Sequence, residues 1–200
     1  MNNILKKIKL VLIHPHIFFK NIKKEKGIKS VLIYYLVILF TIFAIQTIFL
    51  IFHSGSLNLK TDSPFPSLTG QFINVSFFSI IVSFFSFLLL SFVAAGILHI
   101  WIKLWKGEGN YSKTYQLYTY ARTPNLLLQL VPLSFPFLGI VVWFYSLIIF
   151  VIGAQEIYGY SRKKSLLVLA IPAVLIAIFR YLSLIASSFI LGSISQGGFK

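Results

Sequence analysis

The sequence predicts an all-α, polytopic membrane protein, built as a five-helix transmembrane bundle with an N-terminal amphipathic interfacial helix. Of its 200 residues, 58% are hydrophobic and 11% are charged, which is too little charge to cover a water-soluble domain. Residues 63–102 and 123–155 carry no charged side chain, whereas about 20 consecutive apolar residues already cross a bilayer. The basic residues flank these runs, as is typical of membrane helices.

The N-terminal arm, residues 1–29, is expected to be a basic cytoplasmic segment that lies in the membrane interface. Its first helix would carry apolar residues on one face and lysines on the other. The apolar residues are Ile4, Leu5, Ile8, Val11 and Leu12, and the lysines are Lys6, Lys7 and Lys9. Pro15 ends an apolar stretch that is too short for a cleavable signal peptide. We expect the arm to anchor and orient the first crossing; the alternative is a docking surface for a soluble partner.

Five crossings are expected within a transmembrane domain of residues 30–192. The first, at about 31–52, is an uncharged run rich in Ile, Leu and Phe. Turn residues such as Pro64, Pro66 and Gly70 indicate a short loop after it. The other crossings are expected at about 72–102, 117–133, 136–156 and 165–191, and the tail 193–200 is expected to be disordered.

The basic residues decide whether residues 123–155 cross once or twice. Pro132 and Pro136 mark a break between two helices. With that break, every basic residue except Lys60, Arg180 and Lys200 falls on one side, and cytoplasmic loops are enriched in Lys and Arg. The sequence therefore predicts a multi-pass protein with a cytoplasmic N-terminus and the C-terminus outside.

Small and polar residues inside the crossings predict close helix packing. Four serines on one face of the second crossing favour a packing seam over a polar conduit, and they are Ser76, Ser79, Ser83 and Ser86. Gly139, Ser146 and Gly153 recur every seven residues in the fourth crossing and are expected to face a neighbouring helix. Arg180 is expected to snorkel from the fifth crossing to the outer headgroups; a substrate or lipid-phosphate contact is the alternative.

The sequence does not predict an enzyme. The acidic residues are singletons at loops or helix ends, namely Glu25, Asp62, Glu108 and Glu156. There is no phosphate-binding glycine loop, nucleophile elbow or HExxH motif. Cysteine is absent and the four histidines are too scattered to predict a metal site. No catalytic, cofactor or metal site is predicted, and no nucleic-acid partner, because the net charge of +14 gathers at the helix ends.

Three segments follow one another in the order and spacing of a known family. The first holds Pro15, Phe18, Phe19, Ile22, Glu25 and Gly27; the second holds Tyr111, Thr114, Tyr115, Tyr120, Ala121 and Pro124; the third holds Gly153, Glu156, Tyr158, Gly159, Ser161, Lys164 and Ser165, with Pro172 beyond it. Together they resemble the Yip family of membrane proteins, named for interaction with Ypt/Rab GTPases, and its short prokaryotic type in particular. The resemblance implies a five-helix domain with a cytosolic N-terminus and, from the short prokaryotic type, a location in a prokaryotic cell membrane. For eukaryotic members it implies membrane trafficking through Rab partners and Yip-type heteromers.

The expected function is that of a non-enzymatic membrane scaffold or trafficking partner. The alternative is a small transporter or lipid-handling protein with Asn125, Gln129, Arg180 and the serine face along a path. Expected partners are anionic lipid headgroups, a protein at the cytoplasmic face, and other subunits in a homo- or hetero-oligomer. The candidate contact residues for these partners are Lys20, Lys23, Lys24, Lys113, Tyr115, Tyr120, Arg122, Pro124, Glu156 and Arg180.

Overall fold

The computed structural model describes residues 4–54, 77–130 and 136–172, in which the regular elements are all helices. Two short helices, α1 (Ile4–Ile13) and α2 (Pro15–Ile22), precede the long helices α3 (Lys29–Ser54) and α5 (Phe77–Leu104). The chain continues with α6 (Tyr111–Ala121), α7 (Thr123–Leu128) and the long helix α8 (Pro136–Tyr158). Residues 162–172 are also helical.

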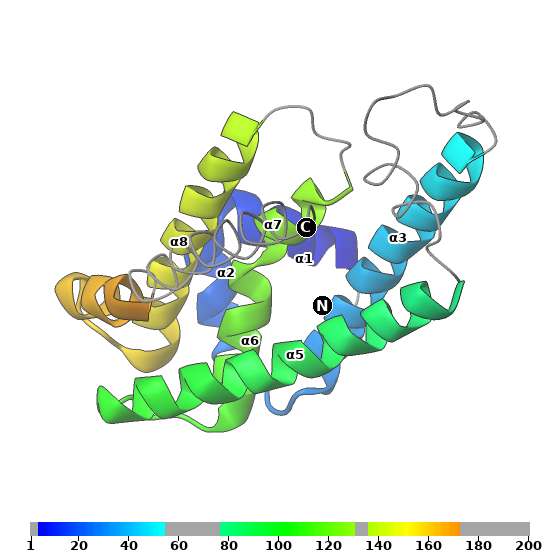
Figure 1. The fold of residues 1–200 in the computed structure, drawn as a ribbon. Helices are drawn as coiled ribbons and strands as arrows, with labels where there is room; N and C mark the ends of the chain where they lie inside the picture. Colours follow the sequence, from blue (N-terminus) through cyan, green and yellow to red (C-terminus); the bar gives the residue numbers. More distant parts are fainter. Residues whose placement is uncertain (1–3, 55–76, 131–135, 173–200) are drawn as a thin grey trace, which may run out of the picture.

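Helix α6 lies at the centre of the described structure, as Figure 1 shows. It packs between α5 and α8 and also contacts α3, while α2 packs against α8. The end of α5, the start of α6, the end of α8 and the turn between α2 and α3 all lie along the lower side of Figure 1. Segments that are distant in sequence therefore meet at one end of the molecule.

Three of the described helices are long and apolar enough to cross a membrane. Their spans are Lys29–Ile48, Ile80–Leu104 and Phe137–Tyr158. Large apolar side chains are exposed along them, most of all on α5, where Leu89 and Ile97 are each 65% exposed. Such a band would be unfavourable in water but suits lipid acyl chains. The prediction of an all-helical integral membrane protein is confirmed.

The long helices lie where three of the expected crossings were placed. Helices α3, α5 and α8 occupy the positions expected for the first, second and fourth crossings. The fifth is helical over the part that is described, residues 162–172. The tail at 193–200 and the proline-marked break at 131–135 lie outside the described residues.

The third crossing differs from the single helix expected at about 117–133. The chain forms α6 and α7 instead, with Arg122 between them. Helix α6 starts early because the Asn110 side chain accepts a hydrogen bond from the amide of Lys113 at 3.3 Å. Figure 1 shows α6 and α7 carrying the chain from the end of α5 back towards the start of α8. The total of five crossings stays a prediction.

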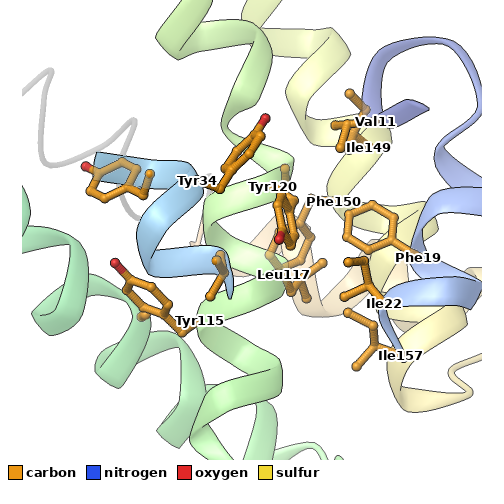
Figure 2. Packing of buried hydrophobic residues seen from close by; sticks show 14 of the residues in the cluster. Val11, Phe19, Ile22, Tyr34, Tyr115, Leu117, Tyr120, Ile149, Phe150 and Ile157 are labelled. Carbon is orange, nitrogen blue, oxygen red and sulfur yellow. The ribbon is translucent and has the colours of Figure 1, made fainter. Parts of the chain in front are cut away.

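The N-terminal arm is part of the folded core. Phe18, Phe19 and Ile22 of α2 are buried, and so is Val11 of α1. Figure 2 shows Phe19 and Ile22 in the cluster that also contains Leu117 of α6 and Phe150 of α8. The expected interfacial helix therefore turns much of its apolar face towards protein, while its place relative to the lipid headgroups stays a prediction.

Aromatic rings join α2, α3 and α6 at the middle of the core. The Tyr120 ring meets the Phe18 ring edge-on, with centroids 4.8 Å apart, and the Tyr34 ring at 4.9 Å. Edge-to-face contacts of this kind stabilise a core beyond the area they bury. Tyr120 and Tyr34 appear close together at the centre of Figure 2.

The expected packing faces are partly observed. A Cβ added to Gly153 would lie 2.5 Å from Leu117 Cδ1 and 2.8 Å from Phe19 Cζ, so this glycine does face close neighbours. Ser146 is also buried and accepts a hydrogen bond from Asn125 Nδ2 at 2.7 Å. A Cβ added to Gly139 would have no described atom of another element within 4 Å, so a close neighbour of this glycine is not observed.

The serine face of α5 is not a seam in the part that can be described. Ser86 is exposed and Ser83 is only half-buried, while Ser76 and the Ser79 side chain lie outside the description. The serine that packs is Ser91, which is buried with its Oγ 3.1 Å from the Tyr115 hydroxyl. The serines spaced three and four positions apart share one face of α5. Helix α6 packs against a different face of α5, the one that carries Ser91.

Candidate functional site

The interior of this membrane protein is polar where α6 passes through it. Thr114 and Gln116 are fully buried on α6, beside the buried tyrosines of the same helix. Burying such groups costs free energy unless each finds a hydrogen-bond partner. Their partners come from the N-terminal arm on one side and from α5 and α8 on the other.

The first polar cluster is built around a buried lysine. Lys7 Nζ donates to Ser30 Oγ at 2.6 Å, to Glu25 Oε1 at 3.3 Å and to the Tyr120 hydroxyl at 3.4 Å. The Lys7 side chain is 5% exposed and the Glu25 side chain 30%. This contradicts the expectation that Lys7 lies on the solvent-facing side of α1. Its charge is held inside because it neutralises Glu25 and joins α1 to α3 and α6.

Two side chains of α6 hold the turn that follows α2. Lys113 Nζ donates to the main-chain carbonyl of Ile22 at 2.9 Å and to that of Glu25, and Gln116 Nε2 donates to the carbonyl of Gly27 at 3.0 Å. Gly27 adopts a φ of +81°, which glycine permits without steric cost. We call the Lys113 and Gln116 contacts the α6 clamp.

The turn after α5 and the loop after α8 pack against each other. A Cβ on Gly107 would lie 2.4 Å from the Tyr160 hydroxyl, and a Cβ on Gly109 would lie 2.8 Å from a Tyr158 ring carbon. The Tyr160 hydroxyl donates to the carbonyl of Ile102 at 3.1 Å. The absence of side chains at the two glycines therefore leaves space for the two tyrosines. This packing holds the two loops together as one unit.

Two hydrogen bonds of one threonine link three helices near these loops. Thr114 Oγ1 lies 2.8 Å from His99 Nδ1 and 2.7 Å from the Tyr158 hydroxyl. One threonine therefore links α5, α6 and α8, which satisfies its buried hydroxyl. His99 thus has a structural partner inside the bundle as well as a position near the end of a membrane span.

The half-buried charges Glu156 and Arg122 have separate partners. The sequence offers Arg122 and residues 162–164 as basic partners for Glu156, but the Glu156 Oε1 lies 3.0 Å from His16 Nδ1. Arg122 instead donates to the Tyr118 hydroxyl, and its guanidinium lies 5.0 Å from the centroid of that ring. His16 reaches the Glu156 carboxylate because α2 packs against the last turns of α8.

The structure separates the described candidate contact residues into three groups by their burial. Lys20, Lys23 and Lys24 are exposed, whereas Tyr115, Tyr120 and Pro124 are buried. In this fold the buried three contact the interior of the protein itself. Lys113, Arg122 and Glu156 are half-buried and take part in the contacts described above. Arg180 lies outside the described residues.

Sequence reasoning missed Lys7, Gln116 and the Thr114 link. Lys7 and the neighbouring lysines of the basic arm have similar sequence surroundings, so nothing local indicated that Lys7 would be buried and the others exposed. A signal did exist for the clamp, because Lys113 and Gln116 are three apart and share one face of a helix. Among the residues that the structure covers, no group of three or more His, Asp or Glu side chains is placed to hold a metal ion.

The fold and these contacts define the class: an all-helical integral membrane domain whose N-terminal arm is clamped into the bundle by a polar central helix. The family model described as the Yip1 domain matches residues 9–191. The chain belongs to the Yip1 domain family, as its sequence motifs suggested. Comparisons with curated proteins and with solved structures found no match.

The residues that carried the family resemblance serve mainly to hold the fold together. In the first motif, Phe18, Phe19 and Ile22 are buried and Glu25 pairs with Lys7. Most of the second motif is buried on α6 and α7. In the third motif, Gly153 leaves room for the Phe19 ring, and the Tyr158 hydroxyl is hydrogen-bonded to the Thr114 hydroxyl. The motifs therefore mark where α2, α6 and α8 meet, and the exposed residues around that junction are the candidates for binding.

Proposed function

We propose that this Yip1-domain protein is a non-enzymatic membrane scaffold, and that it binds a protein partner through the surface formed by residues 106–110 and 159–163. We call this the two-loop surface and place it on the cytoplasmic face. The observation that carries the proposal is the packing of two distant loops into one unit by Tyr158, Tyr160 and two glycines. A surface fixed before binding loses little conformational entropy when a partner docks.

The exposed side chains of the two-loop surface carry both signs of charge. Lys106, Glu108, Arg162 and Lys163 are all exposed. Mixed charge gives a protein partner positions for complementary pairs, which set orientation and exclude wrong partners. The Yip family resemblance supports the same class of role, since its eukaryotic members are expected to act through protein partners.

The transport alternative has weaker support from the described residues. Asn125, one of the groups expected along a path, donates its hydrogen bond to Ser146 within the bundle. Ser86 is exposed on the outer surface of α5. For these reasons we place the scaffold role first.

The test is site-specific photo-crosslinking of the full chain in native membranes. A photoreactive residue in place of Glu108 and, separately, of Arg162 is expected to give the same protein adduct, identified by mass spectrometry as a second copy or another protein. A reactive residue at Ile97, which is 65% exposed on α5, is the matched control and is expected to give no such adduct. Correct insertion with no adduct from either loop position would overturn the proposal.

A further inference from the structure

A group of exposed lysines surrounds the turn between α2 and α3. We call it the lysine turn, and it consists of Lys20, Lys23, Lys24, Lys26 and Lys29, all exposed. On α2 the exposed face includes Ile17, which is 56% exposed, and Lys20, three positions further on. Lys23 and Lys24 follow directly after the helix ends at Ile22. The opposite face, with Phe18, Phe19 and Ile22, is buried.

The groups that would weaken the positive potential of this turn point inward. Glu25 is the acidic residue of the turn, and its Oε1 accepts from buried Lys7. The carbonyls of Ile22, Glu25 and Gly27 accept from the α6 clamp. Within residues 20–29 the exposed charged side chains are therefore all basic, and the backbone of the turn is hydrogen-bonded to α6.

The depth of the turn follows from its neighbours. Phe19 of α2 packs at Gly153 and His16 pairs with Glu156, so α2 lies against the last turns of the α8 span, which ends at Tyr158. Five residues of helix separate Gly153 from Tyr158, a rise of about 7.5 Å. The span of α3 begins at Lys29, within the turn. The turn between α2 and α3 therefore lies at the ends of the α8 and α3 spans, and its lysines lie among the headgroups.

We propose that the lysine turn is a binding site for the headgroups of anionic phospholipids in the leaflet that adjoins it. The exposed charges of the turn are all basic, and the turn lies where the α3 span begins. The inward placement of Glu25 distinguishes this surface from the two-loop surface, where Glu108 is exposed among basic residues. The inference depends on the membrane position of α3 and α8, but not on the scaffold role.

The test uses the purified full chain in phosphatidylcholine bilayers that contain a trace of spin-labelled phosphatidylglycerol or phosphatidylcholine. The fraction of motionally restricted label gives the selectivity for the anionic lipid at physiological salt. The Lys20→Ala, Lys23→Ala, Lys24→Ala variant is expected to lower that selectivity by about fivefold or more, because each basic residue near a headgroup layer contributes attraction. Replacement of the same three lysines by Arg is expected to preserve it.

The matched control removes the same charge elsewhere, at exposed Lys6, Lys9 and Lys163. An equal loss in this control would mean that net charge alone attracts the lipid, and would overturn the site. Unchanged selectivity in the turn variant would overturn it as well. If the turn variant instead lost the adducts at positions 108 and 162 while keeping its lipid selectivity, the turn would belong to a protein interface, so failure of this inference is separable from failure of the scaffold proposal.

Discussion

Gly153 shows how far a single residue sets the distance between helices in this protein. Any side chain there would meet Leu117 of α6 and Phe19 of α2. Helices in lipid gain little from hydrophobicity when they associate, so close packing at small residues matters more than in water. The seven-residue spacing found this glycine from sequence, although it could not name the helices that approach it.

Gly153→Ala is expected to destabilise the protein by about 1–3 kcal/mol, because the new methyl group forces Leu117 and Phe19 to move. Thermal unfolding of the purified protein in detergent would measure the change. Gly139→Ala on the same helix is the matched control, since no described atom lies within 4 Å of its added Cβ. Equal melting temperatures for the two variants would contradict the packing assigned to Gly153.

Lys7→Met is expected to destabilise the fold by about 1–3 kcal/mol, because it leaves the partly buried Glu25 carboxylate without its cation. Lys7→Met combined with Glu25→Gln is expected to recover part of that loss. Lys6→Met, on the exposed side of the same helix, serves as the control. Thermal unfolding again gives the measurement, and a double variant less stable than Lys7→Met alone would show that the ion pair is not the reason.

At the scale of elements, α6 is the helix that sequence reasoning placed least well. Its sequence alternates polar and aromatic residues and includes Lys113, so it does not look like a membrane span. The charge pattern predicts that the chain turns back in this region, and this stays a prediction. Uncharged length was a poor guide to the helix ends. The start depends on the Asn110 cap, and the polar residues are tolerated because the arm, α5 and α8 supply partners.

Gln116→Ala is expected to speed tryptic cleavage after the lysines of the turn, because the Gly27 carbonyl loses its partner and the turn opens more often. Limited proteolysis of the purified protein, followed by mass spectrometry of the fragments, measures the rate. Gln129→Ala changes an exposed glutamine and is expected to leave the rate as in the unmodified protein. The same cleavage rate in both variants would mean that the α6 clamp does not hold the turn.

At the scale of the whole molecule, the arrangement of the loops agrees with the grouping of basic residues found in the sequence. The α2–α3 turn, the end of α5 and the end of α8 lie on one side in Figure 1. This follows if α6 and α7 return the chain across the membrane. The sidedness itself comes from the positive-inside rule.

A reporter fused after Lys200 is therefore expected outside the cytoplasm, and a reporter fused after Lys164 inside it. Alkaline phosphatase and fluorescent-protein fusions, active on opposite sides, would measure both positions. A cytoplasmic signal from both fusions would contradict the fifth crossing. Signals outside at Lys164 would contradict the return of the chain through α6 and α7.

Much of the fold could be predicted because length and hydropathy decide membrane crossings with few competing outcomes. The helices α3 and α5 follow from uncharged runs, and α8 follows from an uncharged run divided at Pro132 and Pro136. The candidate site was harder, because an exposed basic residue such as Lys23 and a buried one such as Lys7 have the same local pattern. Their difference depends on tertiary partners, Glu25, Ser30 and Tyr120, that lie up to 113 positions away.

The buried polar helix α6 also constrains the order in which the protein is made. A segment with Lys113, Gln116 and four tyrosines partitions poorly into lipid by itself. Its partners on α8 are synthesised after it, since Tyr158 follows Thr114 by 44 positions. Residues 111–128 are therefore expected to wait at the membrane surface or in the insertion machinery until α8 emerges. Biogenesis of this bundle is then a cooperative step that involves two helices at once, and a ribosome stalled before α8 would leave α6 outside the bilayer.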